Sequence, residues 1–103
     1  MEVRIEDEVF LYLAEFYEFS LQKHPTLDEV TVLNKEHRLI EALNRLGTHA
    51  NGHPDATRHL PWIRKGYKDY PFEGFHFGYK IETLPSGERV VIVYEARYDS
   101  TFF

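Results

Sequence analysis

A histidine, a glutamate and two arginines in the second half of the chain could form one site for phosphate binding or proton transfer. His76 lies in the segment FHFGYKIET, and Glu95 and Arg97 stand two residues apart in VVIVYEARYD. Arg64 precedes them in PWIRKGY. Arginine holds phosphate oxygens through charge-assisted hydrogen bonds, and a carboxylate or an imidazole can move a proton. These four residues are therefore the candidate catalytic set.

The alternation of apolar and polar residues predicts how these side chains could meet. Residues 75–82 and 88–97 alternate on either side of a Leu-Pro-Ser-Gly loop, which predicts a β-hairpin. If Thr83 pairs with Glu88, the core face carries Phe75, Phe77, Tyr79 and Ile81 opposite Ala96, Tyr94, Ile92 and Val90. The other face then pairs His76 with Glu95 and Gly74 with Arg97, and it also carries Gly78 opposite Val93 and Lys80 opposite Val91.

An ordinary polar strand end is the alternative explanation of this cluster. A cross-strand pair such as His76 with Glu95 stabilises a sheet by roughly 0.2–1 kcal/mol and needs no ligand. From residue types alone, both a structural pair and a phosphate or RNA site stay open.

A first strand and a helix precede these residues. EVRI, residues 2–5, predicts a short strand, and the apolar spacing from Glu6 to about Gln22 predicts a helix. The residues expected to face the sheet are Val9, Leu13, Phe16 and Tyr17. A second apolar flank consists of Phe10, Tyr12 and Phe19, and a helix packed on one side needs only one stripe. We therefore expect this flank to contact a partner protein or a second copy of the chain, with packing inside the monomer as the alternative.

A second helix is predicted directly after His24-Pro25, which ends the first. Thr26 with Glu29 has the spacing of a capping box, and Gly47 is a typical residue after a helix end. The expected apolar stripe is Val30, Leu33, His37, Ile40 and Leu43 or Leu46, with His37 partly buried. Two helices with so short a connection predict an antiparallel helix pair.

The middle of the chain predicts a loop, a strand and a turn. Residues 48–58 carry Asn-Gly and His-Pro and are typical of a loop. HLPWIRKGYKDY predicts a strand with Pro61 at its edge or start, and PFEG predicts a turn. The chain is thus expected to be one domain over residues 1–103, of the α+β class. Its order is β-α-α-β-β-β, with an antiparallel sheet covered on one face by the helix pair.

Three histidines in the loop raise the question of a metal ion. His49, His53 and His59 lie close together with Asp55, but their spacing matches no metal motif. We expect solvated histidines and no cofactor, with a metal site as the alternative. Trp62 is expected to anchor the core or a partner, although a lone tryptophan beside Arg64 could also stack on a base.

Composition limits the classes of function. The net charge is −5, and it comes from residues 1–50, which hold ten acidic and five basic residues. Such a chain is no general polyanion binder, so any nucleic-acid contact needs a local patch in the second half. The 103 residues include no cysteine, no long apolar run and no basic leader at the N-terminus, which together predict a cytoplasmic protein away from membranes.

The whole chain resembles the RelE/ParE superfamily of bacterial type II toxins. The order β-α-α-β-β-β, PWIRKGY before FHFGYKIE, and a final aliphatic strand ending in EARYD are similar to the family's pattern. The resemblance implies a growth-inhibiting toxin that is neutralised by a cognate antitoxin. One branch of the family cleaves mRNA on the ribosome, and the other poisons DNA gyrase.

The resemblance also implies roles for particular residues. Arg97 and Arg64 match family arginines, and Glu95 stands where many members have histidine. RNA or partner contacts are expected from Lys65, Lys68, Lys80 and Tyr98, with Tyr98, Phe102 or Phe103 near the terminal aromatic residue of the nuclease branch. Phe10, Tyr12 and Phe19 are the expected antitoxin or homodimer contacts.

Two departures from the family pattern keep the mode of action open. Family nucleases are usually strongly basic, whereas the pI here is about 5.6, and phenylalanine lacks the hydroxyl of the tyrosine that nucleases carry. The sequence therefore predicts a ribosome-dependent mRNA endonuclease, with two alternatives: a non-catalytic gyrase inhibitor, and a family-fold protein that has lost toxicity.

Overall fold

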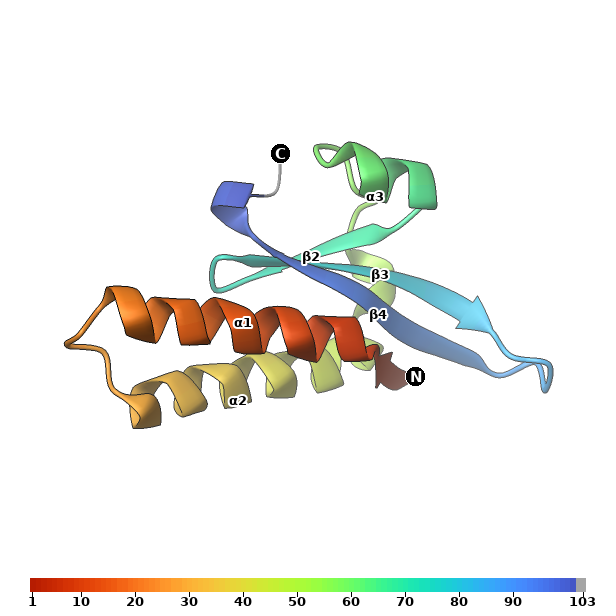
Figure 1. Ribbon diagram of the computed structural model, residues 1–103. Coiled ribbons are helices and arrows are strands. Elements are labelled where there is room, and N and C mark those ends of the chain that lie inside the picture. Colours follow the sequence, from red (N-terminus) through yellow and green to blue (C-terminus); the bar gives the residue numbers. More distant parts are fainter. Residues whose placement is uncertain (102–103) are drawn as a thin grey trace.

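Four strands in the order β1-β4-β3-β2 form the sheet on which the other elements pack (Figure 1). The computed structural model describes residues 1–101. The strands are β1 (Glu2–Ile5), β2 (Lys68–Phe72), β3 (Phe75–Thr83) and β4 (Arg89–Tyr98). The helices are α1 (Asp7–Lys23), α2 (Glu29–Arg45) and α3 (Leu60–Lys65), with single turns η1 (Leu46–Thr48), η2 (Ala50–Gly52) and η3 (Asp99–Thr101). The chain is thus of the α+β class, as predicted.

The sheet is mixed, and the expectation of a fully antiparallel sheet is wrong at one edge. Strands β2, β3 and β4 are antiparallel neighbours, but β1 runs parallel to β4. A parallel neighbour needs a long crossover, and the chain between β1 and β4 is long enough to provide one. The two edges of the sheet are therefore β1 and β2.

The helix pair covers one face of the sheet, as predicted. In Figure 1, α1 and α2 lie side by side below the sheet, joined by a short connection at their far end. Val9, Leu13 and Tyr17 of α1 are buried in the main core, and Phe16 packs against it. None of the helices within residues 1–101 is long and apolar enough to cross a membrane.

The second half of the predicted α2 stripe is confirmed, since Leu43 and Leu46 are buried and Ile40 packs against the main core, but its first half is wrong. The buried residues are Val32, Leu39, Ala42 and Leu43, whereas Val30 and Leu33 are more than 60% exposed. His37, expected to be partly buried, is exposed and pairs with Glu41. The first half was predicted wrongly because half-buried Glu36 interrupts the stripe, and burial raises the pKa of this carboxyl.

The start of α2 differs from expectation, whereas Gly47 follows the cap residue Leu46 at its end as predicted. The helix begins at Glu29, and its cap is Asp28, whose carboxylate accepts from the Thr31 backbone N–H at 2.7 Å. The predicted box of Thr26 and Glu29 is thus wrong. Gly47 is part of η1 and does not adopt a left-handed conformation. It is needed because a Cβ atom there would lie 2.0 Å from the Met1 carbonyl oxygen.

The segment predicted as one strand from His59 to Tyr70 is a helix followed by a strand. Pro61 lies in the first turn of α3, where its missing N–H is not needed. Gly66 ends the helix in the left-handed conformation, with φ of 73°. Strand β2 begins only at Lys68. The predicted turn at PFEG is confirmed, with Glu73 and Gly74 as its two central residues at φ of 48° and 85°.

The hairpin forms, but its register is shifted by one residue and contains a β-bulge. Thr83 pairs with Arg89 instead of Glu88, so Val91 and Val93 face the main core in place of Val90, Ile92 and Tyr94. The bulge lies where Tyr79 pairs with Val93 and Gly78 with Glu95, which leaves Tyr94 as the extra residue. A one-residue shift exchanges the faces of a strand, and the bulge exchanges them again. Ala96 is therefore in the main core as predicted.

Helix α3 covers part of the opposite face of the sheet. Trp62 is fully buried and forms a small second core with Ala56, Tyr67 and Tyr94. The rings of Tyr67 and Tyr94 stack at 5.2 Å with an interplanar angle of 3°. A Cβ atom on Gly78 would lie 3.1 Å from the Trp62 ring and 2.8 Å from the Tyr67 ring. Gly78 therefore lets the Trp62 ring pack directly against the backbone of β3.

We predict that Gly78→Ala destabilises the protein by about 1–3 kcal/mol, because the added methyl group forces Trp62 and Tyr67 away from the sheet. The chain has one tryptophan, so its fluorescence emission should move to longer wavelength in the folded variant. Gly52→Ala is the matched control, since a Cβ atom there meets nothing within 4 Å. Equal stability and emission for both variants would contradict the proposed packing.

Candidate functional site

A buried carboxylate held by two cations lies at the centre of the second face. The Glu95 side chain is only 8% exposed; Lys65 Nζ donates to its Oε2 at 2.9 Å, and Arg97 Nη2 donates to its Oε1 at 3.0 Å. Lys65 comes from the end of α3, whereas Arg97 follows Glu95 by two residues on β4. The site therefore depends on α3 lying across the sheet.

The pKa of Glu95 is lowered although the group is buried. Burial alone acts in the opposite direction and raises it, but the hydrogen bond and charge of Lys65, followed by the charge of Arg97, outweigh that effect. Burial and then the negative charge of Glu95 raise the pKa of Tyr67 to about 12. Near neutral pH, Glu95 is thus an ionised acceptor beside an uncharged phenol, which makes it a weak proton carrier.

His76 lies beside this pair, between two aspartates. Its Nδ1 is 2.9 Å from Asp69 Oδ1, and its Nε2 is 2.6 Å from Asp99 Oδ1. The His76 side chain is 6% exposed, whereas Asp99 is 57% exposed. The two aspartates thus contact the imidazole ring from opposite sides, and Asp99 is the one that faces solvent.

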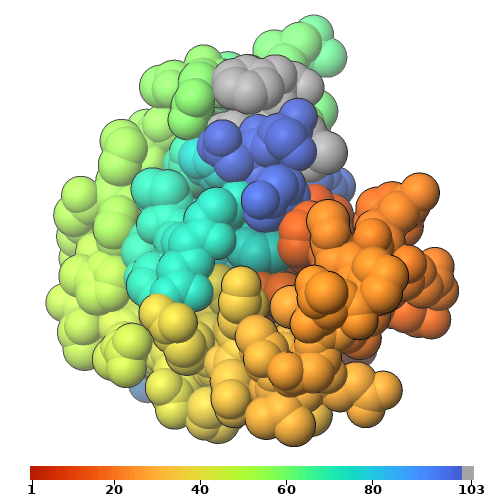
Figure 2. All heavy atoms as spheres, turned by 90° about the vertical axis from the view of Figure 1, so that its left-hand side faces the viewer, coloured from red at the N-terminus to blue at the C-terminus, as the bar shows by residue number. Residues whose placement is uncertain are grey.

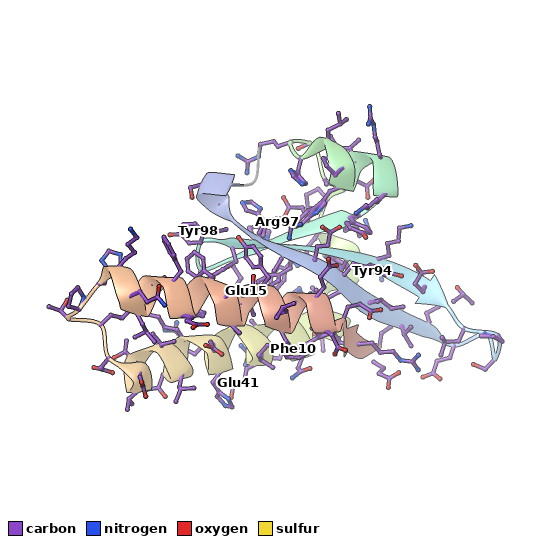
Figure 3. The ribbon with its side chains drawn as sticks, viewed as in Figure 1. Phe10, Glu15, Glu41, Tyr94, Arg97 and Tyr98 are labelled. Atoms are coloured by element: carbon purple, nitrogen blue, oxygen red, sulfur yellow. The ribbon has the colours of Figure 1, made fainter. Side chains whose placement is uncertain are left out.

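Arg97 lies near the end of β4 (Figure 3), where three contacts hold its side chain. Its Nη1 donates to the Ala96 carbonyl oxygen at 2.6 Å, its Nη2 binds Glu95, and its guanidinium lies 5.4 Å from the centre of the Tyr12 ring. Strand β4 pairs with β1 only from Val90 to Val93, so Arg97 wraps around an edge of β4 that β1 leaves uncovered.

Three of the four predicted catalytic residues come together, and the fourth does not. His76 pairs with Arg97 and Gly78 with Glu95, where the sequence predicted Gly74 with Arg97 and His76 with Glu95. All three side chains still lie on the predicted face. Arg64 lies exposed on α3 because that segment is helical, and its neighbour Lys65 makes the contact with Glu95 instead.

The predicted RNA or partner contacts lie in three different places. Lys65 belongs to the Glu95 pair, and Lys68 donates to the His53 carbonyl oxygen and to Asp55. Lys68 and Lys80 together line one polar pocket beside the end of β3. Tyr98 is on the helix-covered face, where it packs against Phe16 and Phe75, so it lies apart from the polar cluster. Phe102 and Phe103 lie outside the described residues.

The predicted partner flank of α1 divides into two parts. Phe10 and Phe19 are 44% and 58% exposed, in agreement with an unpaired flank. Tyr12 instead belongs to the monomer: its hydroxyl accepts from the Tyr98 backbone N–H at 2.7 Å. Tyr12 is therefore only partly exposed: it covers the end of β4 and also lines the groove described next, and its predicted partner contact stays a prediction.

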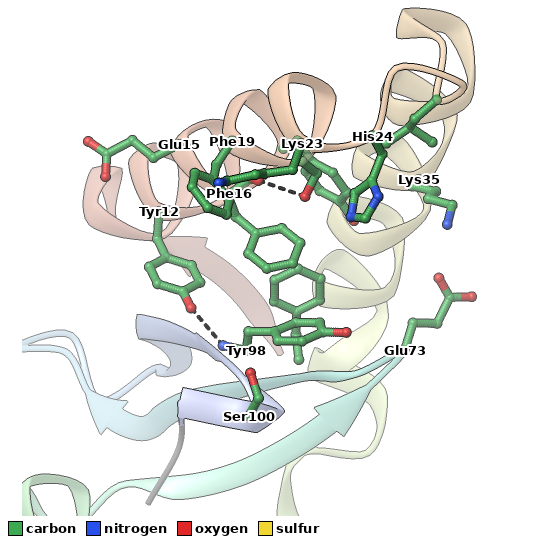
Figure 4. Close-up of a pocket in the computed structure, with 14 residues that line it drawn as sticks. Tyr12, Glu15, Phe16, Phe19, Lys23, His24, Lys35, Glu73, Tyr98 and Ser100 are labelled. Carbon is green, nitrogen blue, oxygen red and sulfur yellow. Dashed lines mark hydrogen bonds between the residues drawn. The ribbon is translucent and has the colours of Figure 1, made fainter.

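A groove of about 1000 Å³ opens beside this flank (Figure 4). It lies where the far ends of α1 and α2, the β2–β3 turn and the end of β4 meet, the side of the molecule seen in Figure 2. Its aromatic lining is Tyr12, Phe16, Tyr17, Phe19, Phe75 and Tyr98, with Lys23 and Lys35 among its charged residues. Burial, then the charges of Glu36 and Glu73, raise the pKa of Tyr17 to about 12.

Two residues of the candidate site, Asp69 and Asp99, were not predicted from the sequence. The two-residue turn at PFEG carried the signal for Asp69. Once Phe72 pairs with Phe75, His76 stands opposite Pro71, and Asp69 lies two residues from Pro71 on the same face. No comparable signal exists for Asp99. It reaches His76 through the turn η3, which the sequence pattern does not predict.

The comparisons with known proteins give no indication of function, so the geometry of the site is the only guide to it. No protein-family model, curated protein or solved structure matches the chain. Within residues 1–101, no group of three or more histidine, cysteine, aspartate or glutamate side chains could hold a metal ion. The chemistry on offer is thus a positioned arginine, an ionised glutamate and a histidine between two aspartates.

We predict that Glu95→Gln lowers the free energy of unfolding by about 1 kcal/mol at pH 7, because the amide carries no charge for Lys65 and Arg97 to pair with. The folded-state pKa of Glu95 is lowered. Its contribution is therefore present above the unfolded-state pKa of about 4.3 and is lost as the pH falls through the folded-state pKa. Urea unfolding at pH 7 and pH 3.5 measures both cases.

Glu88→Gln, in the exposed hairpin loop, is the matched control and should change little at either pH. A difference between Glu95→Gln and wild type that is the same at both pH values would show that charge pairing is not what stabilises Glu95.

Proposed function

We propose that the protein is the toxin component of a type II toxin–antitoxin system of the RelE/ParE kind, and that it inhibits growth by binding its target through the Arg97 end of the second sheet face. The observation that supports this proposal is that the two faces of the sheet differ in what covers them. The helix pair covers one face, and the cluster of Glu95, Arg97 and His76 lies on the other.

The ionised form of Glu95 favours a binding function over RNA cleavage. A general base works best with a pKa near the operating pH, but two cations hold Glu95 ionised in a buried position. The cluster also contains three carboxylates, Glu95, Asp69 and Asp99, against the two cations Lys65 and Arg97. A cluster without excess positive charge suits a protein target better than a chain of phosphates. Following the resemblance, DNA gyrase is the target we propose to test first.

Ribosome-dependent mRNA cleavage is the second candidate, and one observation favours it. His76 stands opposite Arg97 on the neighbouring strand and connects to solvent through exposed Asp99. An imidazole between carboxylates can donate a proton to a leaving group, and an adjacent arginine can stabilise the phosphate. In this mode Glu95 positions Arg97 without transferring a proton.

We predict that expression of the chain without an antitoxin arrests bacterial growth, and that Arg97→Ala relieves the arrest at equal protein level, because Arg97 is the positioned cation of the site. The matched control is Arg89→Ala, which removes an exposed arginine from the other end of the same strand and should stay toxic. Harmless expression of the folded wild-type chain in the chosen host would refute toxicity there.

Two assays with the purified protein separate the modes. A gyrase inhibitor slows supercoiling and leaves translation in a cell extract intact, whereas a ribosome-dependent nuclease stops translation and leaves supercoiling unchanged. His76→Gln should matter mainly for the nuclease, because the amide cannot transfer a proton. If the chain arrests growth but inhibits neither supercoiling nor translation, both modes of action are rejected, although the chain is still a toxin.

We further propose that the cognate antitoxin covers the exposed flank of α1 and the aromatic groove next to it. Phe19 contributes to both, since it is exposed and lines the groove. Aromatic side chains often supply most of the binding energy at such surfaces.

We predict that Phe19→Ser weakens binding of the antitoxin encoded by the adjacent reading frame by about tenfold or more. Leu60→Ser is the matched control, because Leu60 is similarly exposed but lies on α3. The measurement is titration calorimetry with the purified pair. Undiminished binding by Phe19→Ser, or an equal loss with Leu60→Ser, would place the antitoxin elsewhere.

A further inference from the structure

Two loop histidines face one another directly, outside the proposed toxin site. His49 lies between η1 and η2, and His53 directly follows η2. The distance between His49 Nδ1 and His53 Nε2 is 2.7 Å, and the ring centres are 4.9 Å apart. His59, the third histidine of this segment, instead packs edge-to-face against Trp62. The structure thus selects one pair from the three candidates.

The loop holds this pair in place through contacts on several sides. The His53 ring packs against Tyr70 at 4.7 Å and against Tyr79 at 6.3 Å, and the His49 ring packs against Tyr70 at 5.5 Å. The Gly52 backbone N–H donates to the His49 carbonyl oxygen, and Lys68 donates to that of His53. The Tyr79 hydroxyl donates to the Ala50 carbonyl oxygen. Both rings are therefore positioned before any ligand arrives.

The contact between the two rings is a hydrogen bond in which one ring donates and the other accepts. A neutral imidazole is the form that binds transition metals. A change of tautomer in the donating ring frees its lone pair, so that both facing nitrogens can bind one ion.

The spacing of the two nitrogens fits one class of ion best. With metal–nitrogen bonds of about 2.05 Å, two ligands at a right angle lie about 2.9 Å apart, and two tetrahedral ligands lie about 3.3 Å apart. The observed 2.7 Å is the hydrogen-bond distance between the two rings, so the nitrogens must separate and turn toward a shared ion. The separation needed is smallest for ligands at a right angle, which Cu²⁺ and Ni²⁺ adopt in tetragonal sites. A small movement of His49, which is exposed, supplies the difference.

We propose that His49 and His53 form a solvent-open binding site for a divalent transition-metal ion, with Cu²⁺ and Ni²⁺ preferred over Zn²⁺ and water in the remaining coordination positions. Only two protein ligands take part, so the ion exchanges readily. The site is separate from Glu95 and Arg97, and its loss leaves the proposed toxin site intact.

Titration of the untagged full chain with Ni²⁺ tests this proposal. Calorimetry should give one site per chain, and His49→Ala and His53→Ala should each weaken binding by about tenfold or more, since each removes one of two ligands. His37→Ala is the matched control: it removes an exposed histidine that pairs with Glu41 on α2. The control should bind Ni²⁺ as the wild type does.

NMR with Zn²⁺ gives a second readout that does not depend on variants. The chain has six histidines, and the imidazole C–H signals of His49 and His53 should move first while the other four stay in place. Unchanged Ni²⁺ affinity in both single variants, an equal loss in His37→Ala, or simultaneous movement of all six signals would overturn the proposal. Circular dichroism establishes that the variants are folded.

Discussion

The contact between Trp62 and Gly78 is the constraint on which the second face of the sheet depends. An indole ring can lie flat against a strand only where no side chain stands in the way, and Gly78 provides that position. The bulge at Tyr94 lies directly across from it and turns Tyr94 toward the same small core. Once α3 is seated there, Lys65 at its end reaches Glu95. A buried carboxylate is acceptable only with such a partner.

Strand β4 joins this face to the helix pair through its uncovered edge. Beyond Val93 the edge of β4 is not paired with β1, and side chains take over its backbone groups. Tyr12 accepts from the Tyr98 N–H, and Arg97 donates to the Ala96 carbonyl oxygen. An open strand edge is prone to pair with other chains. Arg97 therefore protects the edge in addition to holding Glu95, which explains why an arginine suits this position in purely structural terms.

Sequence reasoning located the elements well where periodicity was strong and failed where a single residue changed the geometry. The α1 stripe of Val9, Leu13 and Tyr17 was correct, because no polar residue interrupts it. The α2 stripe was correct at Leu43 and Leu46 but wrong at Val30 and Leu33, because Glu36 interrupts the apolar pattern between these two parts. Glu95 and Arg97 were placed on the correct face of the sheet, but two errors in the predicted strand pairing cancelled one another. The assumed register was one residue off, and the bulge, which no periodicity announces, cancelled the error at the end of the strand. The short helix α3 was missed because Pro61 is compatible with a strand edge as well as with a helix start.

The groove and the polar cluster are not independent, because both include residues that position the end of β4. Tyr12 and Tyr98 line the groove, and the same Tyr12 ring lies beneath the Arg97 guanidinium. A partner seated in the groove would contact Tyr12 on one side while Arg97 rests on the other. If the antitoxin binds there as proposed, it need not cover Arg97 to affect it. A small shift of Tyr12 would release both the Tyr98 N–H and the support of the guanidinium, and the arginine would then be held by Glu95 and Ala96 alone. Neutralisation through the helix-covered face and activity on the opposite face are therefore compatible in one small domain.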